Sequence, residues 1–381
     1  MTGAGYIFAI AFAATTACSS SSHITFSTSD GGDATARPSA EASTATKDGA
    51  MPDGGAGSQT PVDVPITLST PTSKGTVRFT FPITLGSTAP VTGFLDTGSS
   101  GIRILPGVIP DSAFAEITET VITASYHSGL LLTGVVATIP VSLGGVATPA
   151  AIPVMLVRSI SCEATEPNCG VAGYDAGNYT FFDSARVLVG VGLRNSPSSG
   201  GVASPMSQLR ASPGFVIQGA VQGGTSATMR LFPGASQIAS FKTYRLPVED
   251  GGAPLPNGVA PYSDRYGLPA CLDDKTSGTN YCLGAELDTG NPPVYIEWAA
   301  ADDAGESVLP SGTAIQVTIG PDSGILEQYA FTVGSPPTAG VDEIEVEPAT
   351  LPPYMNLGTQ VFFRYDIYFD PLHGVVGFAS R

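Results

Sequence analysis

Apolar and polar residues alternate with a period of two along much of the chain after residue 61. Two clear examples are Val77–Leu85, which stops at Gly86, and Val135–Leu143, which stops at two further glycines. Arg186–Leu193 and Gln360–Phe369 are similar apolar runs, rich in residues that favour strands. Because a period of two places alternate side chains on opposite faces of a strand, these runs predict an all-β protein.

Helical periodicity is rare. We expect one short helix over Asp111–Thr120, which follows Pro110 and can be capped by Asp111 or Ser112. A second short helix is expected over Ser204–Ala211. No apolar segment after the N-terminal leader is long enough to span a bilayer as a helix.

The N-terminal part has a different pattern. Tyr6–Ala14 is apolar but too short to cross a bilayer, and it is followed by Thr15-Thr16-Ala17-Cys18. Small residues before a cysteine resemble a bacterial lipoprotein signal, which predicts a leader over residues 1–18 and lipidation of Cys18. A disordered apolar leader, or a start codon placed too late, is the alternative. Residues 19–61 are rich in Ser, Thr, Ala, Gly and Asp and predict a disordered tether. We therefore expect an exported protein, either a cell-envelope lipoprotein or a secreted or periplasmic protein.

Composition and charge exclude several classes of protein. Of 381 residues, 46 are Gly and 32 are Pro, and only 13% are charged. No heptad run indicates a long coiled coil, and the glycines lack the strict period of collagen. The net charge of −17 has the wrong sign for a nucleic-acid-binding surface. A turn-rich protein with one large core or two lobes remains.

The five cysteines also favour export. If Cys18 is the lipidation site, the other four fall into two close pairs, and the simplest of three connectivities joins Cys162 to Cys169 and Cys271 to Cys282. A zinc site is the rival interpretation. It is weak because the chain has no CxxC pair and none of its three histidines is near a cysteine.

The triplet Asp-Thr-Gly occurs twice, each time after apolar residues. Phe94–Gly101 reads FLDTGSSG, and Ala285–Asn291 reads AELDTGN. One such triplet is an ordinary turn in a β-protein. Two copies suggest a duplicated half-domain in which Asp96 and Asp288 meet at a pseudo-twofold axis.

The residue types in the triplet suit paired-carboxylate chemistry. Two carboxylates a few ångströms apart cannot both ionise readily, so they share one proton. One can then act as a base on a water while the other acts as an acid on a substrate carbonyl. Glycine permits the tight turn, and the threonine hydroxyl can bond across to the other copy.

Together with further segments, these motifs resemble those of the pepsin-like aspartic peptidases over nearly all of residues 75–381. Tyr126–Gly129 resembles the flap hairpin of that family, and Val187–Leu193 resembles the strand beside its first aspartate. Cys282 precedes Asp288 much as a short disulfide loop precedes the family's second aspartate. Two further segments resemble strands that cross between the lobes in that family: Phe215–Gln218 and Met229–Phe232. The most specific part of the resemblance is C-terminal and covers Asn356–Gly358, Phe362–Asp370 and Val376–Ala379.

The resemblance implies a bilobal all-β fold with two pseudo-twofold-related, β-barrel-like lobes, residues 62–222 and 223–381, around a central cleft. It implies an aspartic endopeptidase that acts on peptide or protein substrates as a monomer, with no metal or organic cofactor and no nucleic-acid partner. Membrane contact would come only through the lipid anchor. The resemblance implies that Asp96 and Asp288 are the catalytic pair and that Thr97 and Thr289 form reciprocal hydrogen bonds between the two loops. It implies that the pair is supported by Gly98, Ser99, Gly290 and Asn291, and that Tyr126 is the flap residue over the cleft.

The sequence departs from the family pattern at several positions. Arg103 stands where a Trp usually bonds the flap Tyr, so we expect the flap to be held differently or an acidic substrate group to be favoured. Asn291-Pro292 replaces Thr-Ser after the second triplet, and Pro292 removes a backbone N–H. Glu286 stands where an apolar residue is expected and could raise the pKa of the pair. A basic inhibitory prosegment is not expected.

Simpler interpretations stay open for several of these residues. The departures also fit a catalytically inactive binding or structural surface protein of the same fold, and a two-carboxylate glycosidase is a remote third candidate. Tyr126 could be a packed or rim aromatic of a hairpin. We expect His127 and His373 to be solvated turn residues, and Trp298, the only Trp, to pack in a core.

Overall fold

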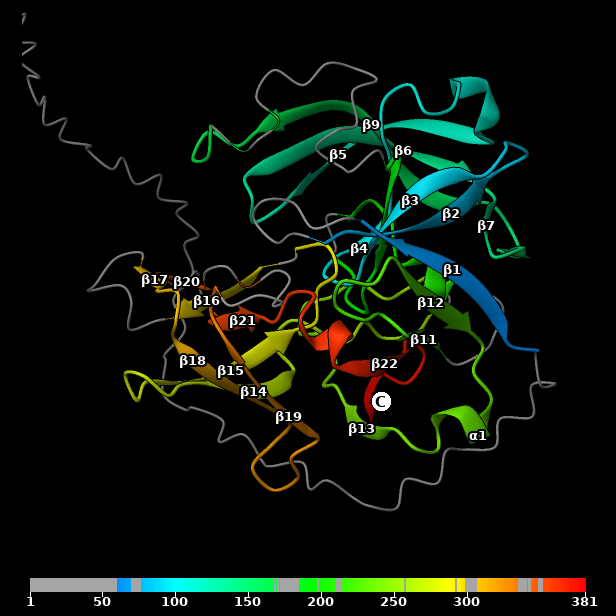
Figure 1. Cartoon of the computed structure of the whole chain (residues 1–381). Coiled ribbons are helices and arrows are strands. Elements are labelled where there is room, and N and C mark those ends of the chain that lie inside the picture. The colour runs from blue at the N-terminus through cyan, green and yellow to red at the C-terminus, as the bar shows by residue number, and fades with distance from the viewer. Residues whose placement is uncertain are drawn as a thin grey trace, which may run out of the picture. The chain divides into compact units, whose positions relative to one another are not determined.

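The computed structural model describes residues 60–69, 77–167, 169, 171, 185–196, 199–209, 214–256, 258–291, 293–298, 307–334, 341, 344–348 and 352–381. Within these ranges its regular secondary structure is almost entirely β-strand (Figure 1), and the all-β prediction is confirmed. Cys18, the expected leader, nearly all of the expected tether and Pro292 lie outside the described residues.

The strands form two sheets. The larger contains fifteen strands: β1 (Val62–Leu68), β2 (Phe79–Leu85), β3 (Val91–Asp96), β4 (Ser100–Ile104), β5 (Glu116–Ser125), β6 (Leu130–Ile139), β7 (Val141–Leu143), β8 (Val146–Ala147), β9 (Ile152–Cys162), β10 (Val187–Val191), β11 (Phe215–Gln218), β12 (Ser226–Leu231), β13 (Lys242–Arg245), β22 (Tyr365–Asp370) and β23 (Val375–Ser380).

The second sheet contains eight strands: β14 (Leu268–Asp274), β15 (Asn280–Glu286), β16 (Val294–Trp298), β17 (Ser307–Leu309), β18 (Ala314–Ile319), β19 (Glu327–Thr332), β20 (Ile344–Pro348) and β21 (Tyr354–Asn356). The described helices are short. They are α1 (Ala235–Ile238) and 3-10 turns at Asp111–Ala113, Pro205–Ser207 and Val361–Phe363.

The helix expected over Asp111–Thr120 is wrong beyond its first turn. A 3-10 turn ends at Ala113, and β5 begins at Glu116 and pairs with β6. The segment contains Ile117, Thr118 and other β-branched residues, whose stiff side chains favour strand over helix. Of the second expected helix, the described residues contain only the 3-10 turn Pro205–Ser207.

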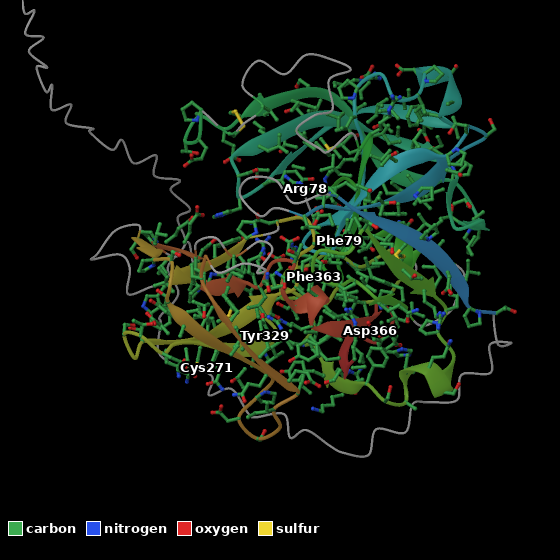
Figure 2. All side chains as sticks on the ribbon, viewed as in Figure 1. Arg78, Phe79, Cys271, Tyr329, Phe363 and Asp366 are labelled. Carbon is green, nitrogen blue, oxygen red and sulfur yellow. A yellow bond between two sulfur atoms is a disulfide. The ribbon has the colours of Figure 1, made fainter. Side chains whose placement is uncertain are left out.

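The expected boundary at residue 222 does not coincide with the division between the sheets. The later strands β12, β13, β22 and β23 belong to the larger sheet, where β22 pairs with β11 through Phe215 and Phe369. Buried apolar side chains from both sheets form one continuous core. The ring centroid of Phe79 on β2 lies 5.9 Å from those of Phe362 and Phe363, so β2 packs against the segment that precedes β22. Figure 2 labels Phe79 and Phe363.

The predicted disulfide pairing is confirmed. Cys162, at the end of β9, is bonded to Cys169, and Cys271 on β14 is bonded to Cys282, its register partner on β15. Trp298 packs edge-on against Tyr281, with ring centroids 5.2 Å apart, and contacts the core. In the described part of the chain, no helix has the length and hydrophobicity needed to cross a membrane.

Each Asp-Thr-Gly motif follows a strand that is flanked by a parallel strand. Asp96 is the last residue of β3, and β10 pairs with β3 in parallel so that Gly190 is opposite Asp96. In the second sheet, β21 pairs with β15 in parallel so that Asn356 is opposite Glu286, two residues before Asp288. This arrangement fixes where each motif turn begins.

Candidate active site

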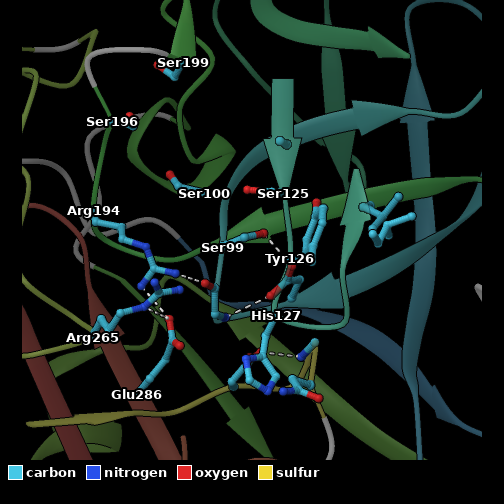
Figure 3. Close-up of a pocket in the computed structure, with 18 of the residues that line it drawn as sticks. Ser99, Ser100, Ser125, Tyr126, His127, Arg194, Ser196, Ser199, Arg265 and Glu286 are labelled. Carbon is cyan, nitrogen blue, oxygen red and sulfur yellow. Dashed lines mark hydrogen bonds and ion pairs between the residues drawn. The ribbon is translucent and has the colours of Figure 1, made fainter. Parts of the chain in front are cut away.

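The structure brings both motif aspartates to one cleft. Asp96 is 3% exposed and Asp288 is 7% exposed, and both line a cavity of about 930 Å³. The same cavity is lined by Tyr126 and His127 from the turn between β5 and β6, as Figure 3 shows from close range. The two motifs are therefore neighbours in space although 192 residues separate them in sequence.

The two carboxylates have matching hydrogen bonds. Gly98 N donates to Asp96 Oδ1 at 2.9 Å, and Gly290 N donates to Asp288 Oδ1 at 2.6 Å. The second oxygen of each carboxylate accepts from a side chain: Ser99 Oγ is 2.5 Å from Asp96 Oδ2, and Asn356 Nδ2 is 2.8 Å from Asp288 Oδ2. Each aspartate is thus held by one backbone and one side-chain donor, which fixes its orientation.

The glycines of the motifs allow the carboxylates to approach each other. A Cβ added at Gly98 would overlap the carboxylate of Asp288. A Cβ added at Gly290 would overlap Asp96 Oδ1 and lie 3.0 Å from Asp288 Oδ1. A single carbon atom at that point would touch both carboxylates, so the two groups lie close enough to interact strongly.

Thr97 and Thr289 join the two motif loops reciprocally. Thr97 Oγ1 donates to the carbonyl of Leu287 at 2.6 Å and accepts from Thr289 N at 2.9 Å. Thr289 Oγ1 donates to the carbonyl of Leu95 at 2.7 Å and accepts from Thr97 N at 3.1 Å. Both threonines are buried, 3% and 0% exposed, so these bonds are made away from water. The hydroxyl–backbone contacts expected for this pair are present.

The pKa of Asp288 is raised well above its ordinary value. Burial is the main cause, and the negative charges of Asp96 and Glu286 act in the same direction. Hydrogen bonds from Asn356 and from Gly290 N partly oppose the rise in this pKa. The negative charge of Asp96 therefore helps to keep a proton on Asp288.

The role expected for Asn291 falls instead to Asn356. Asn291 lines the cleft, but among the described residues the amide that bonds Asp288 comes from Asn356. The orientation of Asn356 is fixed because its own Oδ1 accepts from Gly358 N at 2.7 Å. The sequence signal for this residue is its place at the start of the C-terminal motif that resembles the peptidase family.

The guanidinium of Arg103 contacts the aromatic ring of Tyr126, the expected flap residue. The guanidinium carbon of Arg103 lies 5.6 Å from the centroid of the Tyr126 ring, which is a cation–π distance. Arg103 Nη1 also donates to Ser99 Oγ at 3.2 Å and to the carbonyl of Gly101 at 3.0 Å. Ser99 therefore links Arg103 to Asp96, and Arg103 contacts the face of the Tyr126 ring.

The Tyr126 hydroxyl is buried in the cleft and has no hydrogen-bond partner within the described part of the chain. Burial is the main reason that its pKa lies well above the ordinary tyrosine value. The hydroxyl is therefore a neutral donor at any ordinary pH.

His127 is an exposed residue of the β5–β6 turn, as expected, and it also contacts the second sheet. Its ring stacks on Tyr295 of β16 with centroids 3.9 Å apart and planes 2° from parallel, and its Nε2 lies 3.3 Å from Glu347 Oε1. Burial alone would lower the pKa of His127, but the hydrogen bond and charge of Glu347, with the charges of Glu345 and Glu297, raise it overall. His373 lies in a turn as expected, 2.8 Å from Asp370, with a side chain 47% exposed.

A buried group of charges adjoins the pair and was only partly foreseen. Glu286 is 2% exposed and lies 2.5 Å from Arg194 Nη1 and 3.3 Å from Arg265 Nε. Arg194 also pairs with Asp264 at 2.9 Å and donates to the carbonyl of Gly98. Figure 3 shows Arg194 and Arg265 directed toward Glu286. The sequence singled out Glu286 but gave no signal for its partners, which come from distant segments.

No protein-family model matches this chain, and a search of curated proteins returns no match.

Proposed function

We propose that this protein is an aspartic endopeptidase with a bilobal pepsin-like fold, in which Asp96 and Asp288 activate a water molecule. The observation that carries the proposal is the close approach of two buried carboxylates, each with its own backbone and side-chain donor. Burying two carboxylates that repel each other costs free energy, and a binding or structural protein gains nothing from that cost.

The proposed reaction uses one proton shared by the pair. The raised pKa of Asp288 favours placing that proton on Asp288, with Asp96 as the ionised base. Asp96 takes a proton from the water as the water oxygen bonds to the peptide carbonyl carbon, and Asp288 gives its proton to the carbonyl oxygen. In the second step Asp96 protonates the leaving nitrogen, Asp288 takes a proton from the diol, and the C–N bond breaks. Both carboxyl groups then have their starting protonation.

The cleft supports a peptide as the substrate class. A volume of about 930 Å³ is large enough for several residues of an extended chain. The Tyr126 hydroxyl would donate a hydrogen bond to a peptide lying beneath the β5–β6 turn. Arg103, beside Tyr126, would favour a carboxylate on that peptide.

The catalytically inactive surface protein is the second candidate. The observation that favours it is the ion-pair group of Glu286, Arg194 and Arg265, which places fixed charges next to the pair. In this alternative, Asp96 and Asp288 would be dispensable for the protein's function.

We further propose that the protein is exported, with Cys18 as the lipid attachment site. Two disulfides support this, because such bonds persist in oxidising compartments. Mass spectrometry of the mature N-terminus tests the lipid. A diacylglyceryl group on Cys18 is expected, and cleavage elsewhere without lipid would refute the anchor.

The experiment for the activity is peptide-library cleavage by the purified full chain between about pH 2 and 7, the range that brackets titration of a carboxylate pair. Cleavage is expected from the wild type, with near-complete loss in Asp96→Asn and Asp288→Asn. Asp111→Asn is the matched control, because Asp111 is an exposed carboxylate paired with Arg158 at 2.9 Å. No cleavage by the wild type, or cleavage that survives both active-site changes, would reject the proposal.

A further inference from the structure

A histidine and a row of carboxylates meet beside the cleft, where the β5–β6 turn contacts the second sheet. Strands β16 and β20 pair in parallel, with Tyr295 opposite Glu345 and Glu297 opposite Glu347. Because alternate residues of a strand share a face, these four side chains lie on one face of the sheet. The face is acidic, with three carboxylates and no basic residue among the four.

His127 reaches this face from the other sheet. Its stacking on Tyr295 fixes the plane of the imidazole, and its Nε2 is directed at Glu347, 3.3 Å away. One ligand atom from each of His127, Glu345 and Glu347 lies within 4.8 Å of the other two. The three groups are accessible from solvent, since the side chains of His127 and Glu347 are 27% and 26% exposed.

We propose that His127, Glu345 and Glu347 bind one divalent transition-metal cation of the Zn²⁺ class. An imidazole nitrogen and two carboxylate oxygens are donors that such a cation accepts in four-coordinate sites with one open position. Tetrahedral bonds of about 2.0–2.2 Å place neighbouring ligand atoms about 3.3–3.6 Å apart, which the 3.3 Å distance from His127 Nε2 to Glu347 Oε1 already matches. Small side-chain rotations of Glu345 would bring its oxygen to the same spacing.

Charge favours a cation at this position. Glu345 and Glu347 bring two negative charges close to each other, and Glu297 is near enough to act on the same imidazole. A dication would neutralise this repulsion without requiring His127 to carry a proton. Water or a small anion would occupy the fourth position.

The cation would add a link between the β5–β6 turn and the second sheet. His127 follows Tyr126 in the β5–β6 turn, whereas both glutamates belong to β20. Binding would hold the turn against the second sheet. If the turn closes over substrate, which rests on the proposed function, the bound cation would slow peptide cleavage.

Isothermal titration of the full chain with Zn²⁺ at neutral pH, and visible absorption with Co²⁺, test the site. We expect one equivalent of Zn²⁺ bound and an intense Co²⁺ band typical of four-coordination. Losing a direct ligand should weaken binding at least about tenfold in His127→Ala, Glu345→Gln and Glu347→Gln. His373→Ala and His23→Ala are the matched controls and should bind as the wild type.

Absence of stoichiometric binding by the wild type overturns the inference, as does binding that all three ligand variants retain. Circular dichroism of Glu345→Gln, which keeps the side-chain shape, separates lost binding from lost folding. The outcomes are independent of the peptidase proposal. Metal binding without peptide cleavage would support the metal site and reject the peptidase proposal. Peptide cleavage without metal binding would support the peptidase proposal and reject the metal site.

Discussion

Replacing Thr97 by valine tests the joint between the two motif loops. Valine has nearly the shape of threonine, so the change removes the hydroxyl and keeps the packing. The hydroxyl makes two bonds to the opposite loop: it donates to the carbonyl of Leu287 at 2.6 Å and accepts from Thr289 N at 2.9 Å. Both of these backbone groups then lose a partner in a buried place, since Thr289 is 0% exposed.

The expected loss of stability follows from those two groups. Leaving one buried donor or acceptor unpaired costs about 1–3 kcal/mol, so two cost about 2–6 kcal/mol. A folded protein is stable by about 5–15 kcal/mol, so the change removes a large share of the total. Thr97→Ser keeps the hydroxyl and loses one methyl group, which costs about 1 kcal/mol.

Urea unfolding of the full chain, followed by circular dichroism, measures both variants. Thr289→Val should cost a similar amount, because Thr289 Oγ1 makes the equivalent bonds to Leu95 and Thr97. The double variant should cost less than the sum, because separation of the loops breaks both sets of bonds at once. Equal stability of Thr97→Val and Thr97→Ser would mean that the Thr97 hydroxyl contributes nothing to the joint.

Three further predictions concern the pair and its surroundings. Glu286→Gln removes a negative charge that raises the pKa of Asp288, so that pKa should fall. The alkaline limb of the pH–rate profile for peptide cleavage should then move to lower pH, and an unmoved limb would contradict this. Gly98→Ala should abolish cleavage while the chain still folds by circular dichroism, because the added Cβ would overlap the Asp288 carboxylate; retained activity would show that the carboxylates are not in this arrangement. Replacing Cys271 and Cys282 by serine should lower the free energy of unfolding in urea by about 2–3 kcal/mol, and no loss would mean that the bond does not constrain the unfolded chain.

Most of the fold class could be read from the sequence because its signals are local. The alternation in Val77–Leu85 predicts β2, and the close spacing within each pair of cysteines makes local pairing the simplest of the three connectivities. The expected helix at Asp111–Thr120 failed for a non-local reason. That segment pairs with β6, and its β-branched residues accept the strand that this pairing requires.

Contacts within the candidate site could be predicted where both residues in contact belong to the repeated Asp-Thr-Gly motifs. Two Asp-Thr-Gly triplets are enough to expect Asp96 near Asp288 and a hydroxyl contact between Thr97 and Thr289. Asn356 was missed as the donor to Asp288 because its position depends on the parallel pairing of β21 with β15.

The charged surroundings were the least predictable part. Arg194 reaches Glu286 from 92 positions earlier in the chain, and no motif marks it. His127 stacks on a tyrosine of the other sheet, a contact that depends on how the β5–β6 turn lies against β16. Such contacts follow from tertiary structure alone.

If Asp96 and Asp288 form one interacting pair, the pKa of Asp288 depends on the charge of Asp96. This pKa can be measured by ¹³C NMR of the carboxyl carbons in aspartate-labelled protein, with Asp288→Asn used to assign the signal. We expect Asp288 to titrate well above the ordinary aspartate value of about 3.9 in the wild type. In Asp96→Asn it should titrate at lower pH, because a neighbouring negative charge is removed. Titration of Asp288 at its ordinary value, or at the same pH with and without the Asp96 charge, would contradict the pairing.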